Sequence, residues 1–123
     1  PLDERQAVIT LAGLKIRDRN PDEAVAMLET LLKDRPDDYQ VLNFLGRISV
    51  ENDINLARGI AALEACLALT PPPRSVGHAD IHFQLGEAHA KQGDTAAART
   101  AYEASLQLAP DNPRALAALD RLP

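Results

Sequence analysis

Three histidines and an aspartate gather in one short segment that begins at His78. His78 and His82 lie four residues apart, and Asp80 and His89 belong to the same predicted helix. Two imidazoles at this spacing lie on one helix face and can chelate a metal ion such as zinc. The alternative is that these side chains are structural and pack against a neighbouring helix. The choice depends on the elements that position them.

Asn43 and Arg47 form a second polar pair with a spacing of four residues, so they share one face of a helix. An amide and a guanidinium side by side can hold a peptide backbone group and a carboxylate. Cys66 is the only cysteine, which excludes an intramolecular disulfide and a Cys-rich zinc site. The sequence has no Gly-rich phosphate loop and no nucleophile placed in a motif with a base, so we predict no enzymatic activity.

Composition narrows the class of protein further. The 123 residues are 46 % hydrophobic and only 3 % aromatic, with no Trp, and the net charge is −5. Few aromatics and a negative charge argue against a nucleic-acid partner. No apolar segment is long enough to span a bilayer and no signal peptide is present, so we expect no membrane insertion and a soluble domain of the cytoplasm or the periplasm. The chain starts at Pro1 rather than Met, and we expect it to be a piece of a larger protein.

An internal repeat organises these residues. Small residues and prolines recur at intervals of about 34 residues, with longer spacings where residues are inserted. The recurring positions are Leu11-Ala12, Leu45-Gly46 and Leu85-Gly86, followed by Pro36, Pro71 and Pro110. The inserted segment from Pro72 to Val76 is interpreted as a stiff, solvated connector, and a polyproline ligand is the alternative.

Each repeat is predicted to hold two helices, because its apolar residues follow a helical period. Gly93 ends one helix and Asp94 caps the next, while Asn20 and Glu23 form a capping box around Pro21. No segment alternates with a period of two, so no strands are expected. A last helix runs from Arg114 to about Leu122, and its predicted inward stripe is Ala115, Leu116, Leu119 and Leu122.

These residues resemble the tetratricopeptide repeat family, most clearly in the third unit. The matching positions there are Leu85, Gly86, Gly93, Ala98, Tyr102, Leu106 and Pro110. The second unit matches at Leu45, Gly46, Gly59, Leu63, Leu67 and Pro71, and the first, more weakly, at Leu11, Ala12, Ala24, Leu28, Leu32 and Pro36. The resemblance implies an all-α, right-handed superhelical solenoid forming a single domain over residues 1–123. It would contain three helix-turn-helix units, at about 3–36, 37–71 and 78–111, and a capping helix at 113–122.

The resemblance also assigns roles to several buried positions. Gly46 and Gly86 would let the two helices of a unit approach closely. Cys66 stands where the family has Ala, so an inert buried thiol is expected. His82 and His89 stand where the family has core aromatics. We therefore interpret the histidines as structural, and expect neither a metal nor another cofactor.

Family members typically bind a peptide or partner protein on the concave face, which is lined by the first helix of each unit. Carried over by position, this implies a binding site formed by Ile9, Ile16, Gln40, Asn43, Arg47, Val50, Asp80, Phe83, Glu87 and Lys91. One family subset clamps a terminal carboxylate. Of its residues only Asn43 has a counterpart here, and Asp80 and Glu87 would repel the ligand, so we reject that function.

A second hypothesis is a structural or oligomerisation segment of a larger bacterial protein, with contacts made by the outer helices and the N-terminal face. In the stack, Ala7 and Leu14 correspond to residues that pack on a preceding unit, and they have no predecessor in this chain. We expect this face to be covered by residues before Pro1 or by another chain, which makes a homo-oligomer possible.

Overall fold

The structure, a computed structural model, describes residues 2–123. Within that range it contains seven α-helices and no β-strand, which confirms the predicted all-α fold. The helices are α1 (Leu2–Arg17), α2 (Pro21–Asp34), α3 (Tyr39–Asn52), α4 (Leu56–Leu67), α5 (His78–Lys91), α6 (Thr95–Leu108) and α7 (Pro113–Arg121).

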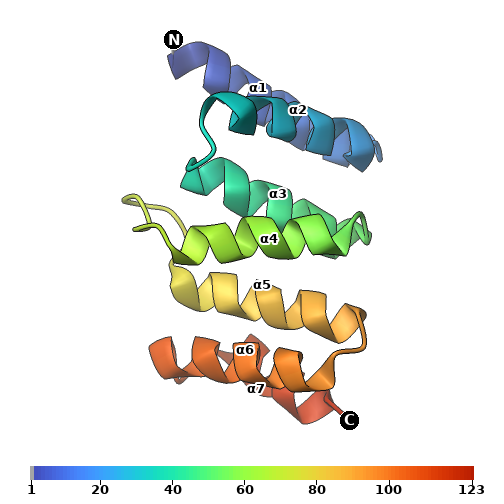
Figure 1. The fold of residues 1–123 in the computed structure, drawn as a ribbon, viewed down its shortest axis with the longest axis vertical. Helices are drawn as coiled ribbons and strands as arrows, with labels where there is room; N and C mark the ends of the chain where they lie inside the picture. The colour runs from blue at the N-terminus through green and yellow to red at the C-terminus, as the bar shows by residue number, and fades with distance from the viewer. Residues whose placement is uncertain (1) are drawn as a thin grey trace.

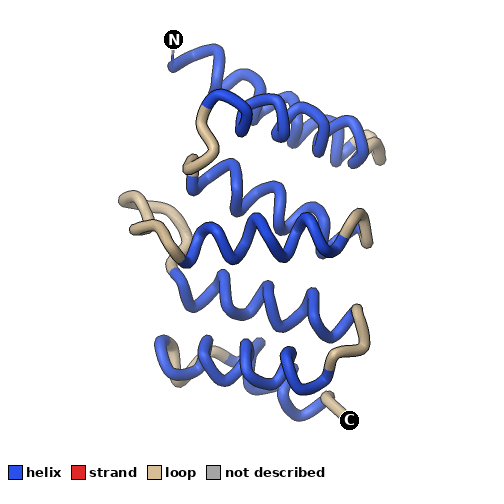
Figure 2. Tube along the Cα trace, in the orientation of Figure 1, coloured by secondary structure: helices blue, strands red, loops and turns tan. Residues whose placement is uncertain are grey.

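The helices stack along one long axis as successive hairpins. Figure 1 shows α1 with α2, α3 with α4, and α5 with α6 as antiparallel pairs, with the two chain ends at opposite ends of the stack. The short turns inside the pairs lie on one side of the molecule, and the connections between pairs lie on the other (Figure 2). The last helix, α7, packs against α6 at the C-terminal end.

Side-chain caps fix where several helices begin. The Asp94 carboxylate accepts a hydrogen bond from the backbone N–H of Ala97 at 3.1 Å, which confirms the predicted cap of α6. Gly93 before it has φ +81°, a left-handed conformation that glycine adopts without strain. The capping box predicted at Asn20 is wrong. The Asn20 amide donates to the Glu23 carboxylate at 2.7 Å instead of accepting a backbone N–H bond.

Gly46 and Gly86 lie where the two helices of a pair are in close contact, as predicted. A Cβ atom on Gly46 would lie 2.5 Å from Cγ of Leu63, and one on Gly86 would lie 2.5 Å from the ring of Tyr102. No real side chain tolerates such distances. The first and second helices of these two pairs therefore approach as closely as they do because position 46 or 86 has no side chain.

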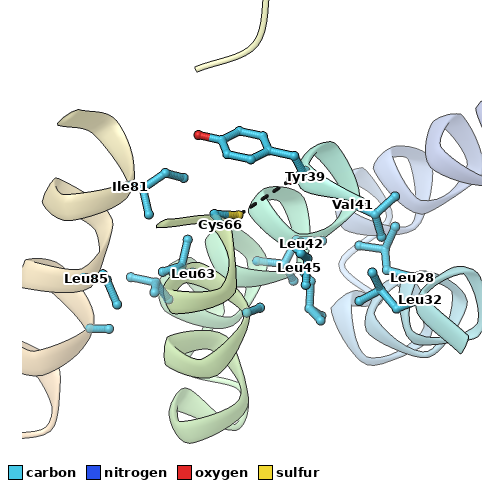
Figure 3. Close-up of a cluster of buried hydrophobic side chains, with 14 of the residues drawn as sticks. Leu28, Leu32, Tyr39, Val41, Leu42, Leu45, Leu63, Cys66, Ile81 and Leu85 are labelled. Carbon is cyan, nitrogen blue, oxygen red and sulfur yellow. Dashed lines mark hydrogen bonds between the residues drawn. The ribbon is translucent and has the colours of Figure 1, made fainter. Parts of the chain in front are cut away.

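Most of the core is aliphatic and extends from α1 to α6, and a second cluster of buried residues joins α5 and α6 to α7. Figure 3 labels side chains of the first cluster from α2 to α5. Cys66 is fully buried in it, and its thiol donates to the Tyr39 carbonyl at 3.7 Å. The residues predicted to pack on the preceding unit, Val41, Ile48, Ile81 and Ala88, are at most 2 % exposed. In the first pair, which no other helix pair of residues 2–123 precedes, Ala7 is exposed and Leu14 is 40 % exposed.

The capping helix α7 buries a different stripe from the predicted one. Ala115 and Ala118 are buried, with Leu119 half-buried beside them, whereas Leu116 is 49 % exposed. Residues 115, 118, 119 and 122 follow a three-and-four spacing on one helix face. Leu116 is rotated by about 100° from Ala115 around the helix axis and so points away from that face. The prediction that Leu116 is buried was therefore wrong.

The inserted connector leaves the stack as a loop beyond α4 and returns at α5 (Figures 1 and 2). Pro72, Pro73 and Arg74 are exposed, as expected for a solvated connector. The loop is fastened near its end, where the Tyr39 hydroxyl donates to the Val76 carbonyl at 2.9 Å. Among the helices described, none combines the length and the hydrophobicity that crossing a membrane requires.

Candidate protein-binding groove

A groove of about 460 Å³ lies where α3, α5 and α7 come together. We call it the α3–α5–α7 groove. Six of the residues predicted for the concave face line it, namely Arg47, Val50, Asp80, Phe83, Glu87 and Lys91. Four further residues that the sequence did not indicate also line it, namely Glu51, Val76, Gln84 and Arg114.

The remaining predicted site residues lie outside this groove. Ile9 is only 8 % exposed and belongs to the core, and Ile16 packs against the same core. The Gln40 side chain accepts a hydrogen bond from the Arg5 guanidinium at 3.1 Å. Asn43 is half-buried and touches the groove residue Gln84. The structure thus brings together residues of α3 and α5 with a residue of α7, and leaves those of α1 apart.

Gln84 is the centre of a hydrogen-bond network that joins α5 to α3. Its Nε2 donates to Oδ1 of Asn43 at 2.9 Å and to Oδ2 of Asp80 at 2.7 Å. Both partners are acceptors, so the orientation of the Gln84 amide is fixed. The Oε1 atom on its other side is buried and has no partner. Because Oδ1 of Asn43 accepts this bond, the Asn43 Nδ2 group is left as a donor.

Phe83 forms the apolar centre of the groove, although only 3 % of it is exposed. The Tyr102 ring lies tilted against it, with the ring centroids 5.8 Å apart. On another side, the guanidinium carbon of Arg114 lies 4.3 Å from the Phe83 ring centroid. A cation that lies over a ring in this way is held in place without a salt bridge.

The acidic residues of the groove are partly engaged by the fold itself. The Tyr102 hydroxyl donates to Oε2 of Glu87 at 3.0 Å. Burial, together with the negative charge of Glu87, raises the pKa of Tyr102, so the phenol remains a protonated donor at physiological pH. Asp80 accepts from Gln84, as described above. These bonds hold the two carboxylates in place at the groove.

Lys91, at the C-terminal end of α5, bonds to the C-terminal end of α3. Its Nζ donates to the Val50 carbonyl and lies 3.3 Å from Oδ1 of Asp53. Both groups are at the C-terminal end of α3, where the helix dipole favours a cation. Lys91 is therefore bound within the fold, unlike the arginines of the groove.

The histidine segment takes part in packing. The His78 ring stacks on Tyr39, and its Nε2 lies 2.9 Å from the Leu69 carbonyl and 3.2 Å from the Cys66 carbonyl. Carbonyl oxygens only accept, so this nitrogen carries the proton. Burial and the nearby His78 lower the pKa of His82. Across residues 2–123, no cluster of three or more His, Cys, Asp or Glu side chains has an arrangement suited to a metal ion.

The Cys66 thiol has the properties of a packing residue. It is fully buried, and burial raises its pKa to about 12. Because the thiolate is the reactive form, such a thiol is unreactive at neutral pH. This agrees with its predicted place in the core.

Arg114, a groove residue that the sequence analysis missed, could have been found from the repeat spacing. Arg114 lies 34 residues after Asp80, the same interval as the repeat, so the period extended into the capping helix would have placed it on the same face. Gln84 carried no such signal, because its role depends on contacts with two other side chains.

Stacked helical hairpins with a groove along their first helices define the chain as an α-helical repeat protein. Two family models, both described as tetratricopeptide repeat, match residues 10–71 and residues 79–112. The chain belongs to the tetratricopeptide repeat family. Repeats of this family generally mediate protein–protein interactions and are typically not enzymes. No curated protein matches the chain significantly.

Proposed function

We propose that this chain is a non-enzymatic interaction module that binds a peptide or a segment of a partner protein in the α3–α5–α7 groove. The observation that carries the proposal is the convergence of polar and apolar groups from three helices on one groove of about 460 Å³. That volume lies within the usual range of ligand-binding pockets, so the groove can hold a short peptide segment with a few side chains.

The proposed binding mode assigns roles to residues that line the groove and to Asn43, which lies beside it in contact with Gln84. The Asn43 Nδ2 group, oriented by Gln84, donates to a backbone carbonyl of the bound segment. Arg47, which is exposed, supplies further donors one helical turn away. Val50 and Phe83 form the apolar floor. A segment that lies across the groove would contact two successive helix pairs, so binding depends on the stack remaining intact.

The test is capture of partners by the intact protein, with Asn43 and Arg47 both changed to Ala. The matched control changes Arg99 and Glu103, which are also four residues apart and exposed, on the outer helix α6. We expect the groove variant to lose the partners that the wild type and the control retain, as identified by mass spectrometry. Equal capture by both variants, with unchanged helical content, would overturn the proposal.

A second candidate is self-association through the N-terminal face. Two large apolar side chains of α1, Leu11 and Leu14, are 48 % and 40 % exposed, and Ala7 lies on the same face. A second copy that packs there would cover this face as a preceding pair covers the second and third pairs. Sedimentation velocity decides the matter. A concentration-dependent dimer that Leu14→Lys abolishes supports this candidate, and a monomer at all concentrations contradicts it.

A further inference from the structure

We propose that the α3–α5–α7 groove recognises an acidic side chain, with Arg114 of the capping helix as the residue that binds its carboxylate. The bound segment would therefore carry an Asp or Glu between neutral or apolar residues. This inference rests on the proposed function, because it specifies the chemistry of the segment that occupies the same groove.

The first argument is the geometry of Arg114. Its guanidinium carbon lies over the Phe83 ring, 4.3 Å from the ring centroid. A guanidinium has five N–H donors, and this contact leaves donors available for a carboxylate. No carboxylate of the described residues lies within ion-pair distance of Arg114. A carboxylate in the plane of the guanidinium would bind it through two hydrogen bonds.

The second argument is that Arg47 repeats this arrangement on α3. Its guanidinium carbon lies 5.4 Å from the Phe44 ring centroid, it lines the same groove, and it has no ion-pair partner among the described residues. Two guanidinium groups, one from α3 and one from α7, thus line the groove, and each lies over an aromatic ring. Their pre-organisation reduces the entropy lost when a ligand binds.

Two arginines elsewhere in the molecule show the pair that a guanidinium forms with a nearby carboxylate. Arg5 forms a two-bond pair with Asp38 at 2.7 and 2.9 Å, and Arg58 forms one with Glu29 at 2.7 and 2.8 Å. These pairs join successive helix pairs. The groove arginines differ from them because their donors are unused, although the chain as a whole is negatively charged.

The acidic residues of the groove limit the ligand without reversing its sign. Asp80 and Glu87 each accept a hydrogen bond within the fold, from Gln84 and from Tyr102. Their charges disfavour a run of acidic residues, and a single carboxylate at Arg114 gains the most. A basic segment is the competing occupant. It would meet Asp80 and Glu87, which already accept bonds, and the exposed Glu51 at the edge of the groove. Two guanidinium groups without an ion-pair partner would repel it.

The test is an NMR titration of the intact protein with three capped tetrapeptides, acetyl-Leu-X-Leu-Ala-amide, in which X is Glu, Gln or Lys. The signals to follow are the Nε–H groups of Arg47 and Arg114 and the backbone amides of α5. We expect the Glu peptide to shift the Arg114 Nε–H signal and to bind about fivefold more tightly than the Gln peptide, the effect of a partly exposed charge-assisted hydrogen bond.

Two variants make the outcome specific. Arg114→Gln is expected to remove the preference for Glu over Gln, while the shifts of the α5 amides persist. Arg99→Gln, an exposed position on the outer helix α6, is expected to leave the preference unchanged. A preference for the Lys peptide, or a Glu preference that survives Arg114→Gln, would overturn this proposal and leave the groove as a binding site. No shift at Arg114 with any peptide would also overturn it, and the capture experiment would then judge the proposed function separately.

Discussion

The first and third helix pairs share one plan and differ in what surrounds them. In the third pair, Tyr102 fills the crossing over Gly86, and α3 and α4 on one side and α7 on the other cover the pair. In the first pair, Ala12 and Leu28 stand at the corresponding positions, both fully buried, and only the second pair adjoins them. One face of α1 remains open, with Leu11 and Leu14 exposed.

The difference shows that position in the stack determines how much each pair contributes to stability. A repeat contacts only its neighbours, so an inner repeat gains from two interfaces and a terminal repeat from one. The C-terminal end is covered by α7, whose buried face consists of two alanines and half-buried leucines. The α3–α5–α7 groove therefore lies in the part of the molecule that is supported on both sides.

Among truncations of buried side chains, the largest effect is expected at the third crossing. Tyr102→Ala removes a fully enclosed ring together with its bond to Glu87, and should lower the free energy of unfolding by about 3–5 kcal/mol. Leu28→Ala at the first crossing should cost less, about 2–3 kcal/mol, because the one-sided pair can relax. Urea unfolding followed by circular dichroism measures both. A greater loss for Leu28→Ala would contradict the comparison.

The glycine crossings provide a finer comparison. Gly86→Ala places a methyl group against the rigid Tyr102 ring and should cost about 1–3 kcal/mol. Gly46→Ala meets the more flexible Leu63 side chain and should cost less. The same urea experiments apply. The idea of tight crossings fails if neither substitution lowers the free energy of unfolding.

The ion pair between the first and second helix pairs should have a smaller effect. Asp38→Asn keeps an N-cap for α3 but removes the charge that holds Arg5, so stability at pH 7 should fall by about 1 kcal/mol. Although burial alone would raise the pKa of Asp38, the bonds from Arg5 and from the Val41 N–H hold it below the ordinary 3.8.

The sign of the pH effect follows from that direction. Stabilisation by Asp38 is fully present above about pH 3.8 and is lost as the pH falls through the lower pKa of the folded state. Unfolding free energies measured from pH 7 to pH 2 should therefore converge for the wild type and Asp38→Asn at acid pH. A constant difference over the whole range would argue against the ion pair.

The smallest effect is expected on the open face of α1. Leu14→Lys should change the free energy of unfolding by no more than about 0.5 kcal/mol, because the side chain is 40 % exposed. Its counterpart in the second pair, Ile48, is 2 % exposed, and Ile48→Lys should unfold that pair. A large loss for Leu14→Lys would show that this face is covered in solution.

The sequence predicted the fold well because helical periodicity and small residues at crossings act locally. Gly46, Gly86 and Cys66 were placed correctly through the repeat alignment and the resemblance to the tetratricopeptide family. How deeply a side chain is buried, and which groups it bonds to, depend on several helices at once. These properties were therefore harder to predict. Ile9 was assigned to the concave face but is buried in the core, and Asn20 was predicted to cap α2 but bonds to Glu23 instead.

The groove was predicted only in part for the same reason. Alignment of the repeats places Arg47 and Phe83 on the first helices of their pairs. It does not show which side chains line the same groove. The roles of Gln84 and Arg114 arise from contacts among α3, α5 and α7.

The central claim is that partners bind where α3, α5 and α7 meet. Hydrogen exchange of the intact protein, with and without a captured partner, tests it most directly because it maps protection along the chain. We predict slower exchange on binding in residues 43–51, 80–91 and 113–118, with α4 and α6 little changed. Protection confined to α4 and α6, or to the open face of α1, would contradict the account.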